Sequence, residues 1–502
     1  MAAHALGAAL TRGVAGTVVA AIGAVAARDP SRTAVIDRGE RRSYAALDLA
    51  LRRAAAWLHL QGIAPGATVG LTLRAEWPHL VASLALFHLG CRQVTLSSRD
   101  APAMRAALAA RLGVSAVIAD GVADAMPGAL LLPLPDIAVI AADAALDAHV
   151  PRAVGGGGTL VITSSGTTGR PKLIAVAEPL LALQGRLTAP LGVVRLRTVG
   201  NEFSTAKRLQ LHTLSAGGTD LLANNLDGTG LPEFCAAFGV QRLNIATLRA
   251  EALLAEAARP GATRWPAATA ITLAGGPVPA ALRQRLMAEL TPEVHVLYAT
   301  SETGPVSIAG PADHGLDPAT VGRPFAGVAI EVVDDAGRPL PPGERGMVRI
   351  RSPAAVAGYL DDPEATGRAF RDGWFLPGDV GSMLPGGALS LAGRGDDMMN
   401  LGTIKIFPAE IEAAAEGFAG VLDCAAFPMR AAGLGDIPML AVVGAEGFDA
   451  AALLAHCRAR LSLRAPRKVI VLPALPRNAA GKVLRRDLPG LAAQQPGPRD
   501  GG

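Results

Sequence analysis

The sequence contains few cysteines, no block of basic residues and no repeat, and each absence excludes a class of protein. Its four cysteines are widely scattered without a CxxC pair, which excludes a disulfide framework and is typical of reduced thiols in a cytoplasmic protein. The formal net charge is +4 over 502 residues, and no run of lysine and arginine stands out, which argues against a nucleic-acid partner. Neither an internal repeat nor a heptad pattern is present, so a solenoid or a coiled coil is not predicted.

What is present is the composition of a large globular protein. Half of the residues are hydrophobic and 18% are charged, which is typical of a folded chain rather than a disordered one. A chain of 502 residues exceeds the size of one ordinary hydrophobic core, so we expect at least two folding units.

The N-terminal segment allows two interpretations. Residues 13–27 follow Arg12 and have the apolar stretch and small-residue ending of a signal peptide. They are too short and too rich in small residues for a convincing membrane span, so no membrane span is predicted. The alternative, which we favour, is an alanine-rich helix that leads into the first domain.

Short apolar runs alternate with helical stretches in the first third of the chain. Residues 69–73 and 93–96 have the pattern of strands and residues 77–89 that of a helix, and residues 114–118 continue the alternation. This order predicts an α/β fold in which parallel sheets are covered by helices. Further on, residues 329–333 and 346–350 flank a turn-forming cluster, which predicts an antiparallel hairpin.

The most informative segment is residues 163–172, Thr-Ser-Ser-Gly-Thr-Thr-Gly-Arg-Pro-Lys, which follows an apolar strand pattern. Hydroxyl side chains between glycines offer hydrogen-bond donors on a backbone that can fold tightly around anionic oxygens, and Lys172 adds a positive charge. The run does not end in the Gly-Lys-Ser/Thr of a Walker loop. A flexible linker would explain the composition but not the terminal Pro-Lys, so the segment favours a polyphosphate-binding loop.

This loop resembles the phosphate loop of the adenylate-forming superfamily, which includes acyl-CoA synthetases, luciferases and adenylation domains. The resemblance covers residues 43–488, because further motifs follow in the family's order. They are Ala-Gly-Gly-Pro at 274–277, Tyr-Ala-Thr-Ser-Glu at 298–302, Trp-Phe-Leu-Pro-Gly-Asp at 374–379, Gly-Arg-Gly-Asp-Asp at 393–397, and Pro-Arg-Asn-Ala-Ala-Gly-Lys at 476–482.

The resemblance implies a fold with two unequal domains. Residues 1–395 would form a large ATP- and acyl-binding domain with doubly wound sheets and a small β-barrel. Residues 396–491 would form a small mobile α+β lid, with Asp396 as the hinge. The Gln/Pro/Gly/Asp-rich residues 492–502 are expected to form a disordered tail.

Three catalytic residues are implied by the resemblance. Lys482 would bridge the carboxylate and the α-phosphate, a task that suits a point charge on a long flexible arm. Glu302 would hold Mg²⁺ against the phosphates, since Mg²⁺ prefers oxygen ligands together with phosphate and water. Lys172 would contribute its charge from the phosphate loop.

The nucleotide would be held by residues from several motifs. By resemblance, Tyr298 stacks on adenine, while Asp379 and Arg394 bind the ribose hydroxyls through charge-assisted hydrogen bonds. The remaining implied contacts come from the phosphate loop, the Ala-Gly-Gly-Pro motif and the Tyr-Ala-Thr-Ser-Glu motif. They are Ser164, Ser165, Gly166, Thr167, Thr168, Gly169, Gly275, Gly276, Pro277 and Ser301.

The sequence departs from the family pattern at several positions. Ala299 replaces a usual glycine and Ser301 a usual threonine, while Pro377 stands where threonine is common. Thr403 stands where relatives carry a glycine beside the path of the pantetheine thiol, and Gly402 could compensate by a shift of one residue. Transfer to a thiol is therefore less securely implied than adenylation.

The acid itself is only partly specified. Ser204 aligns with the position where amino-acid-activating relatives carry an aspartate for the α-amine, so a substrate other than an α-amino acid is expected. Lys207 and Arg208 follow within one helical turn and could pair with a second carboxylate of the substrate. A solvated helix face is the more common explanation of such a pair, and it is the one that we favour from sequence.

The sequence therefore allows three alternative functions. The first, and favoured, is a cytoplasmic ligase that uses ATP to activate a carboxylic acid and transfers the acyl group to CoA. The second transfers it to the phosphopantetheine of an acyl carrier protein. The third is a non-catalytic nucleotide-binding protein, against which the joint presence of Lys172, Glu302, Asp379, Arg394 and Lys482 argues.

Overall fold

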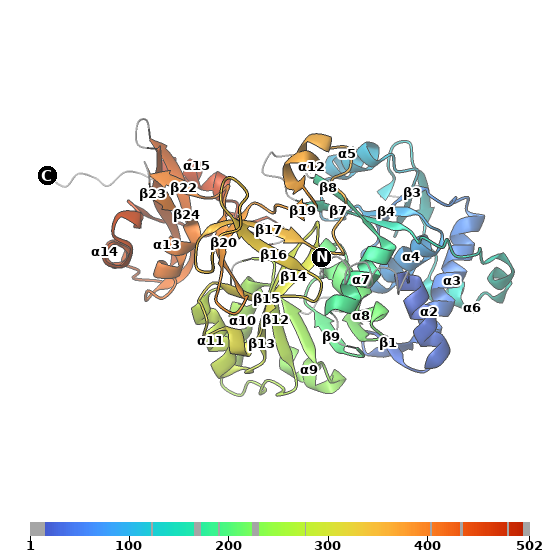
Figure 1. Ribbon diagram of the computed structural model, residues 1–502. Coiled ribbons are helices and arrows are strands. Elements are labelled where there is room, and N and C mark those ends of the chain that lie inside the picture. The colour runs from blue at the N-terminus through green and yellow to red at the C-terminus, as the bar shows by residue number, and fades with distance from the viewer. Residues whose placement is uncertain are drawn as a thin grey trace.

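The computed structural model describes residues 16–121, 124–164, 172–188, 191–222, 230–276, 278–401, 404–431, 435–478 and 481–494. It shows an α/β protein with a large N-terminal domain built on mixed sheets and a small α+β C-terminal domain. Figure 1 places the small domain, coloured orange to red, at one end of the molecule.

The first sheet has the strand order β6-β5-β3-β4-β7-β8 and is parallel except for its last pair, β7 and β8. Its strands are β3 (Thr68–Thr72), β4 (Arg92–Thr95), β5 (Ala116–Ala119), β6 (Leu130–Pro133), β7 (Thr159–Ser164) and β8 (Lys172–Ala177). Helix α4 (Glu76–His88) connects β3 to β4, which confirms the strand–helix–strand unit expected from the sequence.

The second sheet has the order β2-β1-β10-β9-β11-β12-β13-β14-β15-β21-β20-β17-β19-β18; it is parallel from β1 to β13 and antiparallel on both sides of that part. The parallel part and its flanking hairpin comprise β1 (Thr33–Asp37), β2 (Glu40–Ser43), β9 (Val194–Arg197), β10 (Thr219–Leu222), β11 (Arg242–Ile245), β12 (Ala270–Ala274) and β13 (Val294–Thr300). The antiparallel part comprises β14 (Gly304–Ala309), β15 (Thr320–Pro324), β16 (Ala329–Val333), β17 (Gly346–Arg351), β18 (Phe370–Arg371), β19 (Trp374–Phe375), β20 (Asp379–Met383) and β21 (Leu389–Arg394).

The antiparallel hairpin expected around residue 335 is confirmed. Strand β16 pairs antiparallel with β17, and the turn begins with a hydrogen bond from the Gly337 N–H to the Asp334 carbonyl. The sequence resemblance also implied a small β-barrel here. In the described part of the chain these strands form an open sheet, in which β16 pairs with β17 outside the main strand order. The pairing does not close into a barrel there.

Helices cover both sheets of the large domain. They are α2 (Val18–Arg28), α3 (Tyr44–Leu60), α5 (Pro102–Leu112), α6 (Ile137–Ala142), α7 (Glu178–Thr188), α8 (Ser204–Ser215), α9 (Leu231–Phe238), α10 (Thr247–Ala257), α11 (Ala280–Glu289) and α12 (Pro363–Ala369). Polar caps fix several of their starts; for example, the Ser43 hydroxyl accepts from the Ala46 N–H and the Thr17 hydroxyl from the Ala20 N–H.

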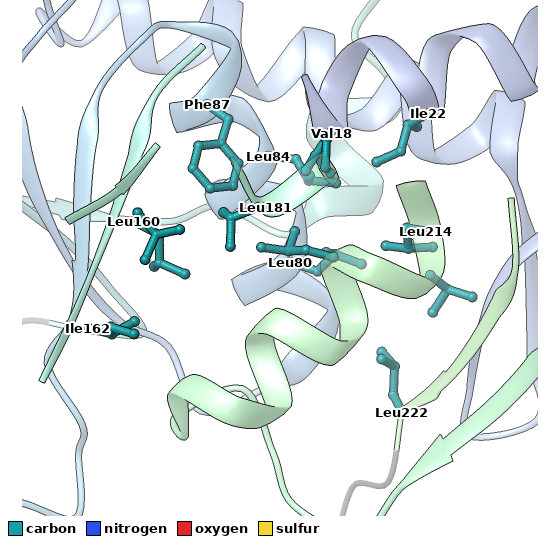
Figure 2. Close-up of a cluster of buried hydrophobic side chains, with 14 of the residues drawn as sticks. Val18, Ile22, Leu80, Leu84, Phe87, Leu160, Ile162, Leu181, Leu214 and Leu222 are labelled. Atoms are coloured by element: carbon teal, nitrogen blue, oxygen red, sulfur yellow. The ribbon is translucent and has the colours of Figure 1, made fainter. Parts of the chain in front are cut away.

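The N-terminal helix is part of the large core, which supports the lead-in interpretation. In Figure 2, Val18 and Ile22 of α2 point toward Leu84 of α4 and Leu214 of α8. The helix is also fixed at its start, because the backbone N–H of Val19 donates to the Glu178 carboxylate at 2.8 Å. Residues 1–15 lie outside the described part.

The small domain has its own sheet and its own cores. Its strands are β22 (Met399–Leu401), β23 (Ile404–Ile406), β24 (Val421–Ala431), β25 (Gly435–Gly444) and β26 (Val469–Val471), and its helices are α13 (Pro408–Ala415), α14 (Ala450–Leu461) and α15 (Leu488–Ala493). Two hydrophobic clusters within residues 399–492 are separate from the core of the large domain. Helix α15 includes the first two residues of the expected tail, and residues 495–502 lie outside the described part.

Among the described helices, none combines the length and the hydropathy that crossing a bilayer requires.

Candidate active site

A tight turn between β13 and β14 positions Glu302. Thr300 and Gly304 are paired across the hairpin, and the Thr303 N–H donates to the Thr300 hydroxyl at 3.0 Å. Gly304 has a φ of +74°, and a Cβ there would lie 2.6 Å from Gln184, so both the backbone angle and the space require glycine. The turn therefore holds Glu302 in one place, with its side chain largely buried.

Tyr359 connects Glu302 with Lys172. The Tyr359 hydroxyl donates to Glu302 Oε1 at 2.8 Å, and Lys172 Nζ lies 4.6 Å from the centre of the Tyr359 ring. Burial, together with the charge and hydrogen bond of Glu302, raises the pKa of Tyr359, so this phenol stays protonated and acts as a donor. The structure thus brings together two of the three catalytic residues predicted from sequence.

Sequence reasoning did not single out Tyr359. It stands in a Gly-Tyr-Leu run without a polar pattern, so nothing local marks it. A global signal exists, because the chain has only three tyrosines and two of them, Tyr298 and Tyr359, lie at this site.

A second group of side chains joins Tyr298, Asp379 and Arg394. Asp379 begins β20 and Arg394 ends β21, and the two are opposite partners in the antiparallel pair. Their ion pair spans 3.3 Å, and the Tyr298 hydroxyl donates to the other oxygen of Asp379. Burial and the Asp379 carboxylate raise the pKa of Tyr298 well above its ordinary value. A carboxylate has about four lone-pair positions, so Asp379 can still accept from the hydroxyls of a ribose.

The two groups lie close enough to interact through their charges. Glu302 contributes to the raised pKa of Tyr298, and Arg394 acts on the pKa of Tyr359 in the opposite direction. One continuous site therefore contains Lys172, Glu302, Tyr298, Asp379 and Arg394.

The backbone that the sequence predicts to face the adenine is exposed. Gly275 and Gly276 follow the end of β12, next to β13 with Tyr298, and both are exposed. A Cβ at either position would meet nothing within 4 Å, and Gly275 has a φ of +96°. A flat ring can therefore approach the backbone here, although Pro277 lies outside the described residues.

The phosphate loop is described only at its two ends. Ser164 ends β7, Lys172 begins β8, and the two residues are antiparallel partners, so the strands return the chain to the point where the loop began. Ser165, Gly166, Thr167, Thr168 and Gly169 lie outside the described residues, as does Pro171. Gly402 and Thr403 lie outside them as well.

The structure does not bring Lys482 to the other catalytic residues. Lys482 is exposed, and its described contacts, which pair its backbone with Asn478, stay within the small domain. Asp396 lies in the turn that connects β21 to β22, with its side chain 3.5 Å from Arg394. The position of Lys482 at the reacting atoms, expected from the sequence, stays a prediction.

A cavity of about 160 Å³ extends from the Glu302 turn into the large domain. Ala299, Thr300 and Ser301 form its mouth, and helix α8 with strands β9, β11 and β12 forms its walls. The cavity is large enough for several water-sized groups, so it can hold a small organic acid. No aspartate or glutamate is among the described residues that line it.

Lys207 and Arg208 are both buried, so the solvated helix face expected from the sequence is wrong. Lys207 points away from the cavity: its Nζ donates to Gln93 Oε1 at 2.9 Å and lies 3.2 Å from His79 Nε2. Burial lowers the pKa of Lys207 to about 7. Arg208 lines the cavity instead. Periodicity alone could not reveal this, because the helix is enclosed on both sides by the two sheets.

Glu302 could bind Mg²⁺ only together with ligands from the phosphates and water. No cluster of three or more His, Cys, Asp or Glu side chains occurs among the described residues, so this part of the chain offers no complete set of metal ligands. Glu302 provides a hard carboxylate, and Mg²⁺ commonly takes one such ligand and completes its octahedron with phosphate and water.

Comparison with known families identifies the class of this protein. The AMP-binding enzyme family matches residues 23–360, and the AMP-binding enzyme C-terminal domain matches residues 410–482. Because the first match covers more than half of the chain, the protein belongs to the AMP-binding enzyme family.

Individual relatives are similar over different shares of their length. A feruloyl-CoA synthase from an Amycolatopsis species is 29% identical, covering 91% of this chain and 96% of its own. A fatty acid–acyl-carrier-protein ligase from Mycobacterium marinum is 32% identical over 39% of this chain and 41% of its own. The structure of o-succinylbenzoate coenzyme A synthetase from Bacillus subtilis, in complex with ATP and magnesium, has a TM-score of 0.83 and 22% identity, and covers 93% of this chain and 98% of its own.

Proposed function

We propose that the protein uses ATP to activate a carboxylic acid and transfers the acyl group to the thiol of CoA. In the first step, a carboxylate oxygen attacks the α-phosphorus of ATP. The bond between the α-phosphorus and the bridging oxygen breaks, and pyrophosphate leaves. In the second step, the thiol sulfur attacks the acyl carbon, AMP leaves, and the thiol proton is released. The observation that carries this proposal is the contact of Glu302, Tyr359 and Lys172 beside a cavity of acid size.

Residues of the large domain would bind each part of the nucleotide and leave its α-phosphate accessible to the acid. Tyr298 with Gly275 and Gly276 would bind the adenine, and Asp379 with Arg394 would bind the ribose. The loop from Ser164 to Lys172 would surround the phosphates. Bound to Glu302, Mg²⁺ would supply charge neutralisation to the phosphates.

The small domain would act as a mobile lid that turns about Asp396. In one position it would deliver Lys482 to the carboxylate and the α-phosphate. In the other it would move Lys482 away and open a path for the thiol. Support comes from the separate cores of the two domains and from the exposed position of Lys482.

CoA is the proposed acceptor, and an acyl carrier protein is the second candidate. The full-length resemblance to a CoA synthase supports CoA, whereas the relative that uses a carrier protein matches less than half of the chain. The four cysteines are free, which fits a cytoplasmic enzyme that draws on ATP and CoA. The absence of a carboxylate among the described cavity residues supports an acid other than an α-amino acid.

The test is the exchange of labelled pyrophosphate into ATP with a panel of carboxylic acids. Exchange that depends on the acid and on Mg²⁺ is the expected result, because adenylation is reversible while the adenylate stays bound. A control without acid measures the background. Absence of exchange with every acid, in protein that still binds ATP, would support the non-catalytic alternative.

A further inference from the structure

The acid cavity is lined in part by cationic and polar side chains that form no ion pair within the described part of the chain, although Asp220, Glu293 and Glu302 act on the arginines from further away. Arg195 on β9, Arg242 on β11 and Arg208 on α8 line the cavity, together with His212 and Asn244. Arg195 and Arg242 are neighbours across the strand pair, so their side chains lie on the same face of the sheet. The feature goes beyond an apolar acyl pocket, which would be lined by hydrocarbon.

Arg208 is held in the cavity by neutral groups only. Its guanidinium donates to Gln184 Oε1 at 2.8 Å and to the carbonyls of Thr300 and Ser301 at 3.4 and 3.3 Å. No described carboxylate lies within ion-pair distance, although the charge of Glu302 acts on it from further away. Burial lowers the pKa of Arg208 to about 10, so it stays charged at neutral pH.

Arg195 is also buried, and part of its guanidinium group forms no hydrogen bond with the described residues. Arg195 is only 5% exposed, and its Nε has no hydrogen-bond partner among the described residues. Arg197, two residues further along β9 on the same face, is a comparison, because its guanidinium forms ion pairs. Arg197 bonds both oxygens of Asp220, at 3.0 and 2.7 Å, and Glu76 at 2.8 Å. Burial lowers the pKa of Arg195 to about 10, so its charge is also retained.

Two neutral groups complete this part of the cavity. His212 is buried, and neither of its ring nitrogens has a partner. Burial lowers the pKa of His212 well below its ordinary value, as do Arg208 and Arg195, so the ring offers one donor and one acceptor. The side-chain oxygen of Asn244 is likewise buried without a partner. Buried polar groups are normally satisfied, so three residues of one cavity, Arg195, His212 and Asn244, with polar atoms that lack a partner among the described residues indicate a missing polar ligand.

We infer that the cavity binds a carboxylic acid that carries a second anionic group, most simply a second carboxylate, at the end remote from the reacting one. This inference rests on the proposed function and names its class of substrate. The second carboxylate would lie against Arg195 and accept a hydrogen bond from His212, and Arg208, which contacts the Thr300 and Ser301 carbonyls, would add its charge from the side of the Glu302 turn. The reacting carboxylate would lie at the mouth of the cavity, beside Ser301 and Glu302. A buried arginine is the side chain best suited to such a group, since its planar fork matches a carboxylate.

The experiment compares acids that differ only in the second group. We would measure pyrophosphate exchange with hexanoate against hexanedioate, octanoate against octanedioate, and 4-methylbenzoate against terephthalate. The wild type should prefer the diacid in at least one pair. In Arg208→Gln and Arg195→Met, kcat/KM for that diacid should fall by about 30-fold or more, and by a clearly larger factor than kcat/KM for the monoacid. The exposed Arg259→Gln serves as the matched arginine control.

A binding measurement separates this inference from the proposed function. The midpoint of thermal unfolding is measured with each acid in the presence of α,β-methylene ATP. This analogue cannot adenylate the acid, because its α–β methylene bridge is not cleaved. A diacid should raise the midpoint of the wild type more than its monoacid does, and Arg195→Met should remove that difference. Equal effects within every pair, or unchanged selectivity in both variants, would contradict the inference even if exchange occurs. Loss of all exchange with retained diacid binding would contradict the proposed function and leave the ligand class supported.

Discussion

At the scale of single residues, the site depends on side chains whose partners come from distant parts of the chain. Glu302 is buried in a hairpin turn, yet its hydrogen-bond donor comes from residue 359 and the neighbouring cation from residue 172. Asp379 connects in the same way with Tyr298 and Arg394. Residues of three predicted motifs therefore lie near the end of the phosphate loop, where Tyr359 joins them, whereas the motif at 476–482 does not.

Lys482→Ala should slow adenylation by about 100-fold or more and change ATP affinity only a few fold. The lysine would act as negative charge accumulates at the α-phosphorus, so its loss removes a transition-state interaction on the order of 3 kcal/mol. The measurement is acid-dependent pyrophosphate exchange beside ATP binding. Lys468→Ala, an exposed lysine of the same domain, is the control and should behave as wild type. Wild-type exchange in Lys482→Ala would refute the assigned role.

Tyr359→Phe should raise the KM for Mg²⁺-ATP about tenfold, because a hydrogen bond to a charged carboxylate contributes roughly 1.5–3 kcal/mol. The phenol would hold the Glu302 carboxylate at the metal, so the effect should weaken as Mg²⁺ is raised. Tyr44→Phe is the contrasting variant. Its hydroxyl donates to the buried carbonyls of Leu214 and Gly218 at 2.9 and 2.7 Å, so its loss should lower stability without changing this KM. An unaltered KM and Mg²⁺ dependence in Tyr359→Phe would mean that the bond does not position Glu302.

At the scale of elements, helix α8 lies between the two sheets and divides its polar residues between them. Arg208 faces the cavity, while Lys207 joins the buried network with His79, Gln93 and Ser83. The His79 Nδ1–H donates to the Leu73 carbonyl, which leaves Nε2 as an acceptor toward Lys207. The helix is thus fixed in rotation, and this sets which face reaches the cavity.

Lys207 should make stability depend on pH above neutrality. Burial lowers its folded-state pKa to about 7, against about 10.4 when unfolded, so between these values the unfolded chain binds more protons. The free energy of unfolding should therefore rise from pH 7 toward pH 9, by at most about 1.4 kcal/mol per pH unit from this group. Urea unfolding of wild type and Lys207→Met should diverge over that range, with Lys468→Met as control. Parallel curves would contradict a neutral Lys207 in the fold.

Much of this architecture could be predicted from sequence, because apolar periodicity and the motifs are local. The β3–α4–β4 unit and the β16–β17 hairpin were located to within about two residues. The burial of Lys207 and Arg208 could not be predicted, since it depends on the second sheet closing over α8. The charge of the cavity was hidden for the same reason: Arg195, Arg242 and His212 come from three separate elements.

At the scale of the whole molecule, two domains meet at the turn that holds Asp396. The Arg345 guanidinium, which also lies over the Phe407 ring, bridges to Glu410 at 2.8 Å, and β21 leads directly through the turn into β22. The Arg345–Glu410 ion pair is partly exposed, and each domain has a core of its own, as the proposed rotation of the small domain would require.

Asp396→Pro should separate the two half-reactions. Proline fixes φ in the connecting turn, and none of the described backbone hydrogen bonds uses the Asp396 N–H, so the fold should tolerate it. A single turnover should still form the adenylate, whereas transfer to CoA should fall by at least about tenfold if rotation is needed. Asp396→Ala, which lacks the restraint, should retain both steps. Equal loss of both steps in a folded Asp396→Pro protein would show that this residue is not the hinge.

The measurement that tests the account most directly is a product analysis of one reaction. The enzyme is incubated with ATP, Mg²⁺, CoA and the acids of the exchange assay, and AMP, pyrophosphate and the acyl thioester are quantified together. The account predicts equal amounts of the three products, with a diacid consumed in preference to its monoacid. Formation of ADP and phosphate, or AMP without any thioester when CoA and a phosphopantetheinylated carrier protein are each supplied, would contradict it.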